Sequence, residues 1–247
     1  MEIDHKLLTA LGNKQGLTNK EHIEKSWMQD HLLYYLAKKH DNLIFKGGTA
    51  LYKFHALPRF SEDLDFSIKT KIDKTVLEEF CKTYMCSLSY KKVHSLHLFK
   101  LRFHGILTKL NTIRVDINVT SSIYTSEVKT YISPYPDVPP FLIKVMSLQE
   151  ILAEKIHGLF NRTKARDLYD LFSILRIVEK ADKEIIIKKL HDYNILIKEK
   201  NLSKELGKKI KLLAPLWEKE LKHFILIELP DFKIVSDFVL KKLKYIQ

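Results

Sequence analysis

A glycine turn and a pair of aspartates are the residues of this sequence best suited to chemistry. The turn, Gly-Gly-Thr, occupies residues 47–49, and thirteen residues separate it from Asp63, which precedes Asp65 by two positions. Glycines let backbone N–H groups approach an anion, and the start of a following helix favours phosphate. Side chains alternate along a strand, so the two carboxylates share a face, their Cα atoms roughly 7 Å apart. The two carboxylates repel each other unless a hard cation such as Mg²⁺ binds between them. Together these features predict metal-assisted phosphoryl or nucleotidyl transfer.

A third carboxylate, Asp116, lies in an alternating segment over residues 112–120. The alternation places Asp116 on the polar face of a predicted strand. If this strand lies beside the strand of the aspartate pair, the three carboxylates form a cluster able to hold two Mg²⁺ ions. In the alternative interpretation, Asp116 pairs with Arg114 or Arg102 on a polar face.

The second half of the chain carries further charged residues that could contact phosphate. Lys155 lies in a helix that begins at a capping box, in which Glu150 follows Ser147 by three residues. Asp167 stands in the first turn of the next helix, where the helix dipole favours a carboxylate whatever its function. A solvated lysine and a helix-terminal acid are therefore the simpler interpretations. Basic residues that could contact RNA or nucleotide phosphates are Arg59, Arg162, Lys164 and Arg166.

Periodicity predicts the elements that position these residues. Apolar residues at steps of three and four predict a helix over 22–40. The apolar run 42–45 predicts a buried strand that leads into the glycine turn, and Thr49 is expected to cap the helix that follows. Alternation predicts further strands over residues 63–68, 97–103 and 112–120, whereas residues 75–85 have a helical pattern. From Arg166 onward helical periodicity dominates.

These patterns predict an α+β protein in two parts. An α/β domain over residues 1–140 carries the candidate metal and nucleotide site. A helical domain over residues 141–247 is expected to contribute Lys155 and Asp167 to the cleft.

Composition narrows the class of protein. The 247 residues include 42 Lys+Arg and 30 Asp+Glu, a net charge of +12 that favours a polyanionic partner such as nucleic acid. A hydrophobic fraction of 45% excludes a disordered chain, and two cysteines exclude a disulfide framework. The absence of a leader pattern and of a long apolar stretch predicts a cytoplasmic protein with no membrane partner.

The motifs resemble those of the AbiEii/AbiGii toxin family of nucleotidyltransferase-like proteins. Four motifs stand in the family's order within about residues 20–180, namely GGTAL at 47–51, RFSEDLDF at 59–66, EK at 154–155 and RDLYDL at 166–171. The resemblance implies a polymerase-β-type nucleotidyltransferase core, with a mixed β-sheet flanked by helices, followed by a helical domain.

The resemblance also implies roles for individual residues. Gly47, Gly48 and Thr49 would bind the nucleoside triphosphate. Asp63 and Asp65 would bind Mg²⁺ or Mn²⁺. Asp116, placed near them by the strand pattern rather than by the resemblance, is expected to assist and could also act as the base. Lys155 would contact phosphate, and Asp167 would support catalysis.

Relatives in this family include toxins that add nucleotides to the 3′ end of tRNA, and the family is also linked to phage defence by abortive infection. The resemblance therefore implies a nucleotidyltransferase that uses an NTP and a tRNA acceptor and has an antitoxin encoded nearby. Two alternatives stay open: a non-catalytic module of the same fold that binds nucleotide or RNA, and a nucleotidyltransferase that acts on a protein or a small molecule. The net charge of +12 disfavours the cationic substrates of antibiotic adenylyltransferases.

Overall fold

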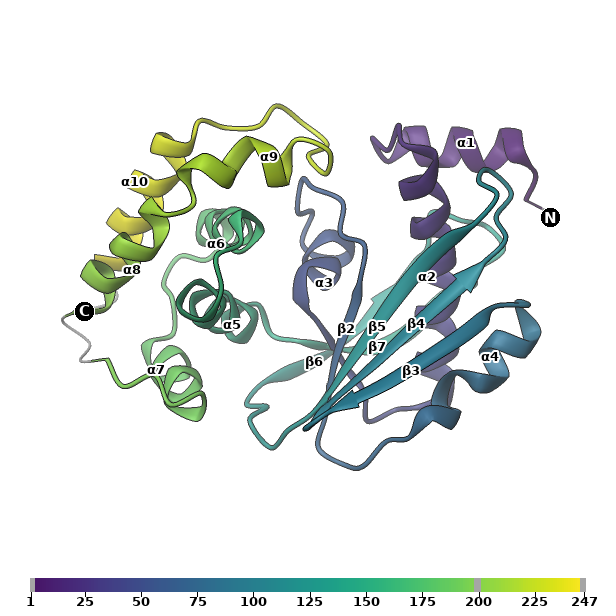
Figure 1. The fold of residues 1–247 in the computed structure, drawn as a ribbon, viewed down its shortest axis with the longest axis horizontal. Coiled ribbons are helices and arrows are strands. Elements are labelled where there is room, and N and C mark those ends of the chain that lie inside the picture. The colour runs from purple at the N-terminus through teal and green to yellow at the C-terminus, as the bar shows by residue number, and fades with distance from the viewer. Residues whose placement is uncertain (1–2, 198–200, 245–247) are drawn as a thin grey trace. The chain divides into compact units, whose positions relative to one another are not determined.

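The computed structural model describes residues 3–197 and 201–244 and contains two compact units (Figure 1). The first unit comprises Met1–Ala56 and Phe60–Met146, and the second comprises Leu57–Arg59 and Ser147–Gln247. The first is a mixed α/β unit and the second is helical, as the periodicity predicts. Residues 141–146, which the sequence analysis assigned to the helical part, instead form a strand of the sheet.

The first unit contains one sheet and the helices that pack on it. Its helices are α1 (His5–Lys14), α2 (Lys20–Lys39), α3 (Gly47–Phe54), the 3₁₀ turn η1 (Lys74–Leu77) and α4 (Glu78–Thr83). Its strands are β1 (Ile44–Lys46), β2 (Leu64–Ile68), β3 (Ser87–Val93), β4 (Leu96–Phe103), β5 (Asn111–Val119), β6 (Ser126–Tyr131) and β7 (Phe141–Met146). Their order across the sheet is β3-β4-β5-β2-β1-β7-β6.

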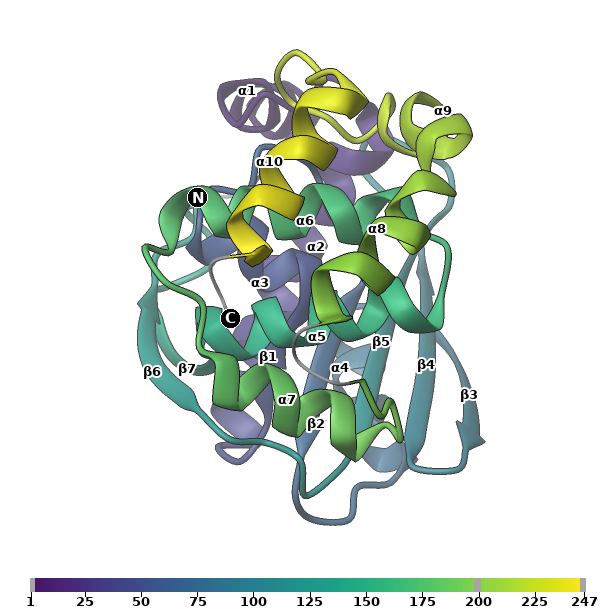
Figure 2. The same ribbon diagram turned by 90° about the vertical axis from the view of Figure 1, so that its left-hand side faces the viewer.

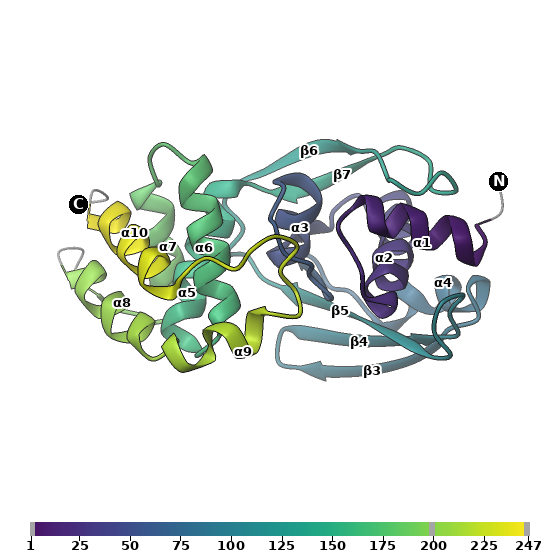
Figure 3. The same cartoon turned by 90° about the horizontal axis from the view of Figure 1, so that it is seen from above.

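The sheet is mixed, which confirms the predicted fold class. Strands β2 and β5 pair in parallel, as do β1 and β7, and the other neighbours are antiparallel. Helix α2 packs on β5 and β7, α3 packs on β1 and β2, and α4 packs on β3. Figure 3 shows α2 and α3 lying over the middle of the sheet, between β7 and β5.

Alternation along β5 explains how the sheet separates its core from its polar face. Ile113, Val115 and Ile117 are fully buried, whereas Arg114 and Asp116 point to the opposite face. Strand β3 was not predicted, because all but one of its residues are exposed and edge strands of this kind lack an apolar period.

A buried ion pair ties the helices of this unit together. Asp30 of α2 is fully buried, and its carboxylate pairs with Lys53 of α3. The same carboxylate accepts hydrogen bonds from the hydroxyls of Tyr131, at 3.1 Å, and Ser133, at 2.6 Å. Asp30 therefore links α2, α3 and the end of β6.

The second unit is built around α5. Its elements are α5 (Leu148–Asn161), α6 (Ala165–Ile177), α7 (Lys183–Asp192), α8 (Leu202–Lys211), the 3₁₀ turn η3 (Ala214–Leu216), α9 (Trp217–Leu221) and α10 (Phe232–Lys244). Helix α5 packs against α6, α7 and α8, and α10 packs against α6 and α8 (Figure 2). The predicted cap is present: Ser147 Oγ accepts a hydrogen bond from the Glu150 N–H at 3.2 Å.

The short segment Leu57–Arg59 belongs to this helical unit. Arg59 forms a β-bridge with Ile225, and the Leu226 N–H donates to the Pro58 carbonyl at 3.1 Å. Within the described residues, no helix combines the length and the apolar character needed to cross a bilayer.

Replacing Asp30 tests the buried pair. In Asp30→Asn the Lys53 ammonium stays buried without its counter-charge, and we expect the free energy of unfolding to fall by about 3–5 kcal/mol. Urea unfolding followed by circular dichroism measures the loss. The matched control is Glu79→Gln, which removes a carboxylate from the exposed pair with Lys39 and should leave stability nearly unchanged. Equal effects of the two substitutions would contradict the assignment.

Candidate active site

Two aspartates face each other across the parallel strands β2 and β5. The register pairs Asp65 with Asp116, and it pairs Leu64 with Val115 and Phe66 with Ile117 on the buried face. The two carboxylates therefore leave the sheet on the same face, side by side. The adjacency on which the three-carboxylate hypothesis depends is present.

Asp63 joins this face through an arginine of the neighbouring strand. Arg114 Nε donates to Asp63 Oδ1 at 2.9 Å, and Arg114 Nη2 donates to Asp63 Oδ2. This paired contact holds the pKa of Arg114 above its usual range. In the alternative interpretation Asp116 pairs with Arg114 or Arg102. The structure gives Arg114 a different hydrogen-bonded partner, Asp63, although the charge of Arg114 also acts on Asp116 and lowers its pKa.

Asp116 lies in an environment that disfavours its charge. The pKa of Asp116 is raised to about 6, mainly by its burial and to a smaller extent by the negative charges of Asp65 and Asp63. A carboxyl group that titrates near neutrality and is accessible from one side of the sheet can accept a proton from a reacting hydroxyl.

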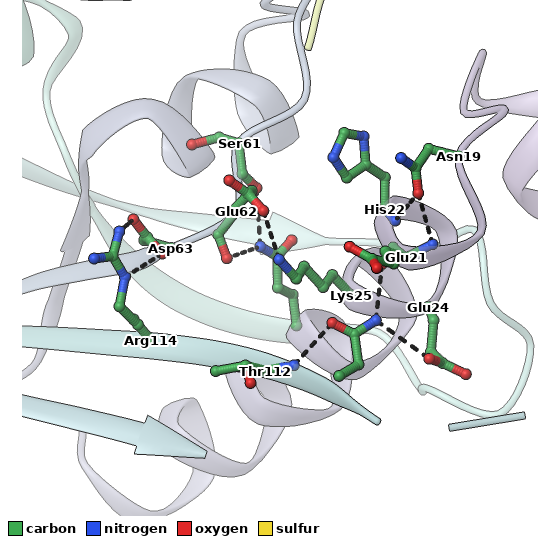
Figure 4. A network of polar contacts seen from close by, with 12 residues as sticks. Asn19, Glu21, His22, Glu24, Lys25, Ser61, Glu62, Asp63, Thr112 and Arg114 are labelled. Carbon is green, nitrogen blue, oxygen red and sulfur yellow. Dashed lines mark hydrogen bonds and ion pairs between the residues drawn. The ribbon is translucent and has the colours of Figure 1, made fainter. Parts of the chain in front are cut away.

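The segment before β2 is anchored by α2, which fixes the aspartate motif. Gln29 Nε2 donates to the carbonyls of Ser61 and Glu62, both at 2.9 Å. Lys25 forms an ion pair with Glu62 at 2.5 Å. Figure 4 shows the pair of Lys25 and Glu62 beside the pair of Asp63 and Arg114. Sequence reasoning missed these anchors; a signal for them is a polar residue, Gln29, on the buried side of α2.

Gly47 makes room for the second aspartate of the motif. Its φ is +75°, and a Cβ at this position would lie 2.3 Å from Asp65 Oδ2. Only glycine adopts this conformation readily and also leaves this space. Gly48 is buried in the first turn of α3.

Thr49 has a different place from the one predicted. The N-cap of α3 is Lys46 rather than Thr49. Thr49 is fully buried, and its hydroxyl donates to the carbonyl of Asp63. This bond helps to fix the aspartate motif, and it is at odds with the expected contact between the hydroxyl and a triphosphate.

The donor set of this face suits a hard divalent cation. Asp63, Asp65 and Asp116 offer only carboxylate oxygens, which Mg²⁺ and Mn²⁺ prefer. Burial first, and then the charges of Asp65 and Asp63, raise the pKa of Asp116, so a cation bound here would relieve an unfavourable charge. Within residues 3–197 and 201–244, however, no three acid, imidazole or thiol groups already converge as a metal site. Arg114 occupies both oxygens of Asp63, so binding a cation through all three acids requires that arginine to move.

A second cluster of charges is buried in the helical unit. Lys155 Nζ lies 3.2 Å from Asp167 Oδ1 and 2.8 Å from Asp170 Oδ2. Arg59 makes a paired contact with Asp170, with both distances 2.7 Å. Burial alone would raise the pKa of Asp170, but Arg59 and Lys155 hold it below its usual range.

Asp167 is shared between the buried lysine and an arginine. Burial opposes its charge, yet Lys155 and Arg162 hold its pKa below the usual range. Arg162 Nε donates to Asp167 Oδ2 at 2.7 Å, although 59% of the arginine side chain is exposed. The predicted helix-terminal position of Asp167 is confirmed, whereas the exposed-lysine interpretation of Lys155 is wrong.

The four predicted phosphate contacts have unequal environments. Arg59 is buried, with 2% of its surface exposed, and this burial argues against the predicted contact with RNA. Arg162 is bound to Asp167. Lys164 is half exposed, with Glu220 at 3.8 Å, and Arg166 lies over the ring of Phe224 at 5.9 Å. Sequence reasoning missed the contact between Arg59 and Asp170, because those residues lie 111 positions apart.

The mixed sheet, with its aspartates beside a glycine turn, has the architecture of a nucleotidyltransferase. The chain matches the model of the nucleotidyl transferase AbiEii toxin family, a type IV toxin–antitoxin system, over residues 31–237. It belongs to that family.

Solved structures share this fold at low sequence identity. MenT4, a nucleotidyltransferase toxin from Mycobacterium tuberculosis, is 20% identical with a TM-score of 0.69, and the match covers 99% of this chain and 90% of MenT4. JHP933 from Helicobacter pylori is 21% identical with a TM-score of 0.64, and the match covers 93% of each chain. A comparison with curated proteins gives no match.

The pKa of Asp116 predicts a pH dependence of stability. In metal-free buffer the folded protein keeps a proton on Asp116 between its usual pKa of 3.8 and about 6, whereas the unfolded chain releases it. The resulting stabilisation is complete below about pH 4 and is lost as the pH rises through about 6. We expect Asp116→Asn to gain stability relative to the wild type between pH 4.5 and pH 7.5. Urea unfolding in EDTA at both pH values tests this, and a difference that does not change with pH would contradict it.

The buried cluster predicts a large loss of stability in Asp170→Ala. This substitution leaves Arg59 and Lys155 with too little counter-charge in the core of the helical unit, and we expect a loss of about 3–5 kcal/mol. Chemical denaturation of the whole chain measures it. The control, Arg162→Ala, removes a largely exposed group and should have a much smaller effect. A wild-type midpoint in Asp170→Ala would rule out this structural role.

Proposed function

We propose that this protein transfers a nucleoside monophosphate from an NTP to the 3′ end of tRNA and acts as the toxin of a toxin–antitoxin pair. The observation that carries the proposal is the opposition of Asp65 and Asp116, with Asp63 on the same face and the glycine turn against Asp65. Membership of a nucleotidyltransferase toxin family supports the reaction class and implies an antitoxin partner. The net charge of +12 favours a nucleic-acid acceptor, and the choice of the 3′ end of tRNA follows the family resemblance.

Mg²⁺ bound by the three aspartates would neutralise phosphate charge and orient the α-phosphate. Asp65 and Asp116 have the chemistry to hold the ion. Asp63 can join them when Arg114 releases it, and the freed guanidinium can then bind phosphate oxygens. The N–H groups of Gly47 and Gly48, at the start of α3, would face the triphosphate.

In the transfer step, the acceptor 3′-oxygen forms a bond to the α-phosphorus. The bond between that phosphorus and the β-phosphate oxygen breaks, and pyrophosphate leaves. The proton of the hydroxyl passes to the Asp116 carboxylate. A pKa of about 6 in the metal-free protein fits this role, because a base near neutrality is deprotonated yet still accepts a proton.

Lys155 and Asp167 belong to the helical unit, and their part in transfer stays a prediction. Lys155 is held by two carboxylates, so we propose that its first role is to organise the helical unit. With NTP and tRNA as substrates, the site of action would be the cytoplasm. Phage defence by abortive infection is the biological role that such a toxin would serve.

The decisive experiment supplies total tRNA, Mg²⁺ and each α-labelled NTP in turn. We expect wild-type protein to label tRNA with at least one nucleotide, and EDTA to abolish the labelling. In Asp65→Asn the rate should fall about a thousandfold, since a catalytic metal supplies several kcal/mol and each 1.36 kcal/mol is tenfold.

The matched control is Asp41→Asn, the same change at an exposed position before β1. It should label tRNA at the wild-type rate. Equal labelling by Asp65→Asn and wild type would refute the site. Labelling of a co-purified protein or metabolite in place of tRNA would refute the acceptor.

A further inference from the structure

Strands β3, β4 and β5 present a group of cations on the same face as the aspartates. The register places Lys100 opposite Arg114, Arg102 opposite Thr112, and Lys91 opposite Leu98. Leu98 in turn lies opposite Asp116, so all of these side chains leave the sheet on the Asp116 face. We define the basic patch as Lys91, Lys100, Arg102 and Arg114.

The positive charge of this patch is compensated only at one end. Arg114 is bound to Asp63, but none of Lys91, Lys100 and Arg102 forms an ion pair within residues 3–197 and 201–244. Residues 87–103, which span β3 and β4, contain no acidic residue at all. Lys100 and Arg114 are like charges directly opposite each other, an arrangement that destabilises a sheet. A patch of this kind is best explained by an anionic ligand.

The spacing and the neighbours of the patch favour a polynucleotide over an acidic protein. Cations on adjacent strands are about 5 Å apart, and Lys100 and Arg102 on one strand are roughly 7 Å apart. The patch thus presents regularly repeated charges. Its polar neighbours on the same face include the hydroxyls of Ser87 and Thr112, which suit phosphate oxygens. Aromatic anchors, which are typical of protein interfaces, are absent from these positions.

The direction of the patch links it to the site. Arg102 and Lys100 lie on β4, Arg114 follows on β5, and its guanidinium holds Asp63. We propose that the basic patch binds the phosphate backbone of the polynucleotide acceptor and leads its 3′ end to the aspartates. This delivery role rests on the proposed function, whereas binding of the backbone does not require turnover.

Binding of fluorescently labelled tRNA, measured by anisotropy between 50 and about 200 mM KCl without NTP, tests the inference. In the double variant Lys100→Glu, Arg102→Glu we expect affinity to fall at least about tenfold. The slope of log Kd against log salt should fall by about two, roughly one for each lost phosphate contact.

The matched control is Lys92→Glu, Lys109→Glu, with the same change in net charge. Lys92 is exposed on the opposite face of β3, and Lys109 is exposed in the β4–β5 connection. It should bind tRNA with near wild-type affinity and salt slope. Lys100→Gln, Arg102→Gln repeats the test without introducing repulsion, and thermal unfolding checks that each variant is folded.

Each outcome decides the inference. Equal losses in the patch and control variants would show that only net charge matters and would overturn it. Competition by polyglutamate as strong as that by RNA would point to an acidic protein and would also overturn it. Patch-dependent tRNA binding by a wild type that transfers no nucleotide would support the inference and refute the proposed function.

Discussion

Two carboxylates held side by side on neighbouring strands set the constraint that the rest of the sheet must meet. The parallel register of β2 and β5 fixes Asp65 opposite Asp116, and burial together with the charge of Asp65 raises the pKa of Asp116. The backbone hydrogen bonds of a central strand pair prevent the two groups from moving apart. Their charge must therefore be offset locally, by a proton, an arginine or a metal.

The surroundings of the aspartates provide such compensation while keeping the face accessible. Arg114 neutralises Asp63 through a contact that is more than half exposed on the arginine side, so a stronger ligand can displace it at modest cost. Gly47 lets Asp65 lie against the start of α3. Gln29 holds the backbone carbonyls of Ser61 and Glu62, and Lys25 binds the Glu62 side chain, so α2 fixes the segment that carries the aspartates.

In the helical unit, by contrast, opposite charges are buried together. Its cluster of Arg59, Lys155, Asp167 and Asp170 is buried, and each member has an opposite partner at hydrogen-bond distance. Buried pairs of this kind add little net stability compared with an apolar core, but they are costly to break. The cluster therefore specifies how α5, α6 and the segment Leu57–Arg59 pack within this unit. The same motif residues that suggested phosphate contacts are, in the folded chain, mainly ligands for one another.

The sequence by itself determined which face of its strand or helix each residue lies on. Alternation put Asp63, Asp65 and Asp116 on polar faces, the glycine turn was visible before α3, and helical periodicity separated the second half of the chain. Only the tertiary structure decided which strands are neighbours and which charges meet. Strands β3 and β4 lie between β2 and β5 in the chain, so no local pattern reports that parallel register or the pairing of Arg114 with Asp63. The sequence pattern did not predict that Thr49, Arg59 and Lys155 are buried, for the same reason. Periodicity indicates which face of an element a residue lies on, whereas its partners depend on packing between distant segments.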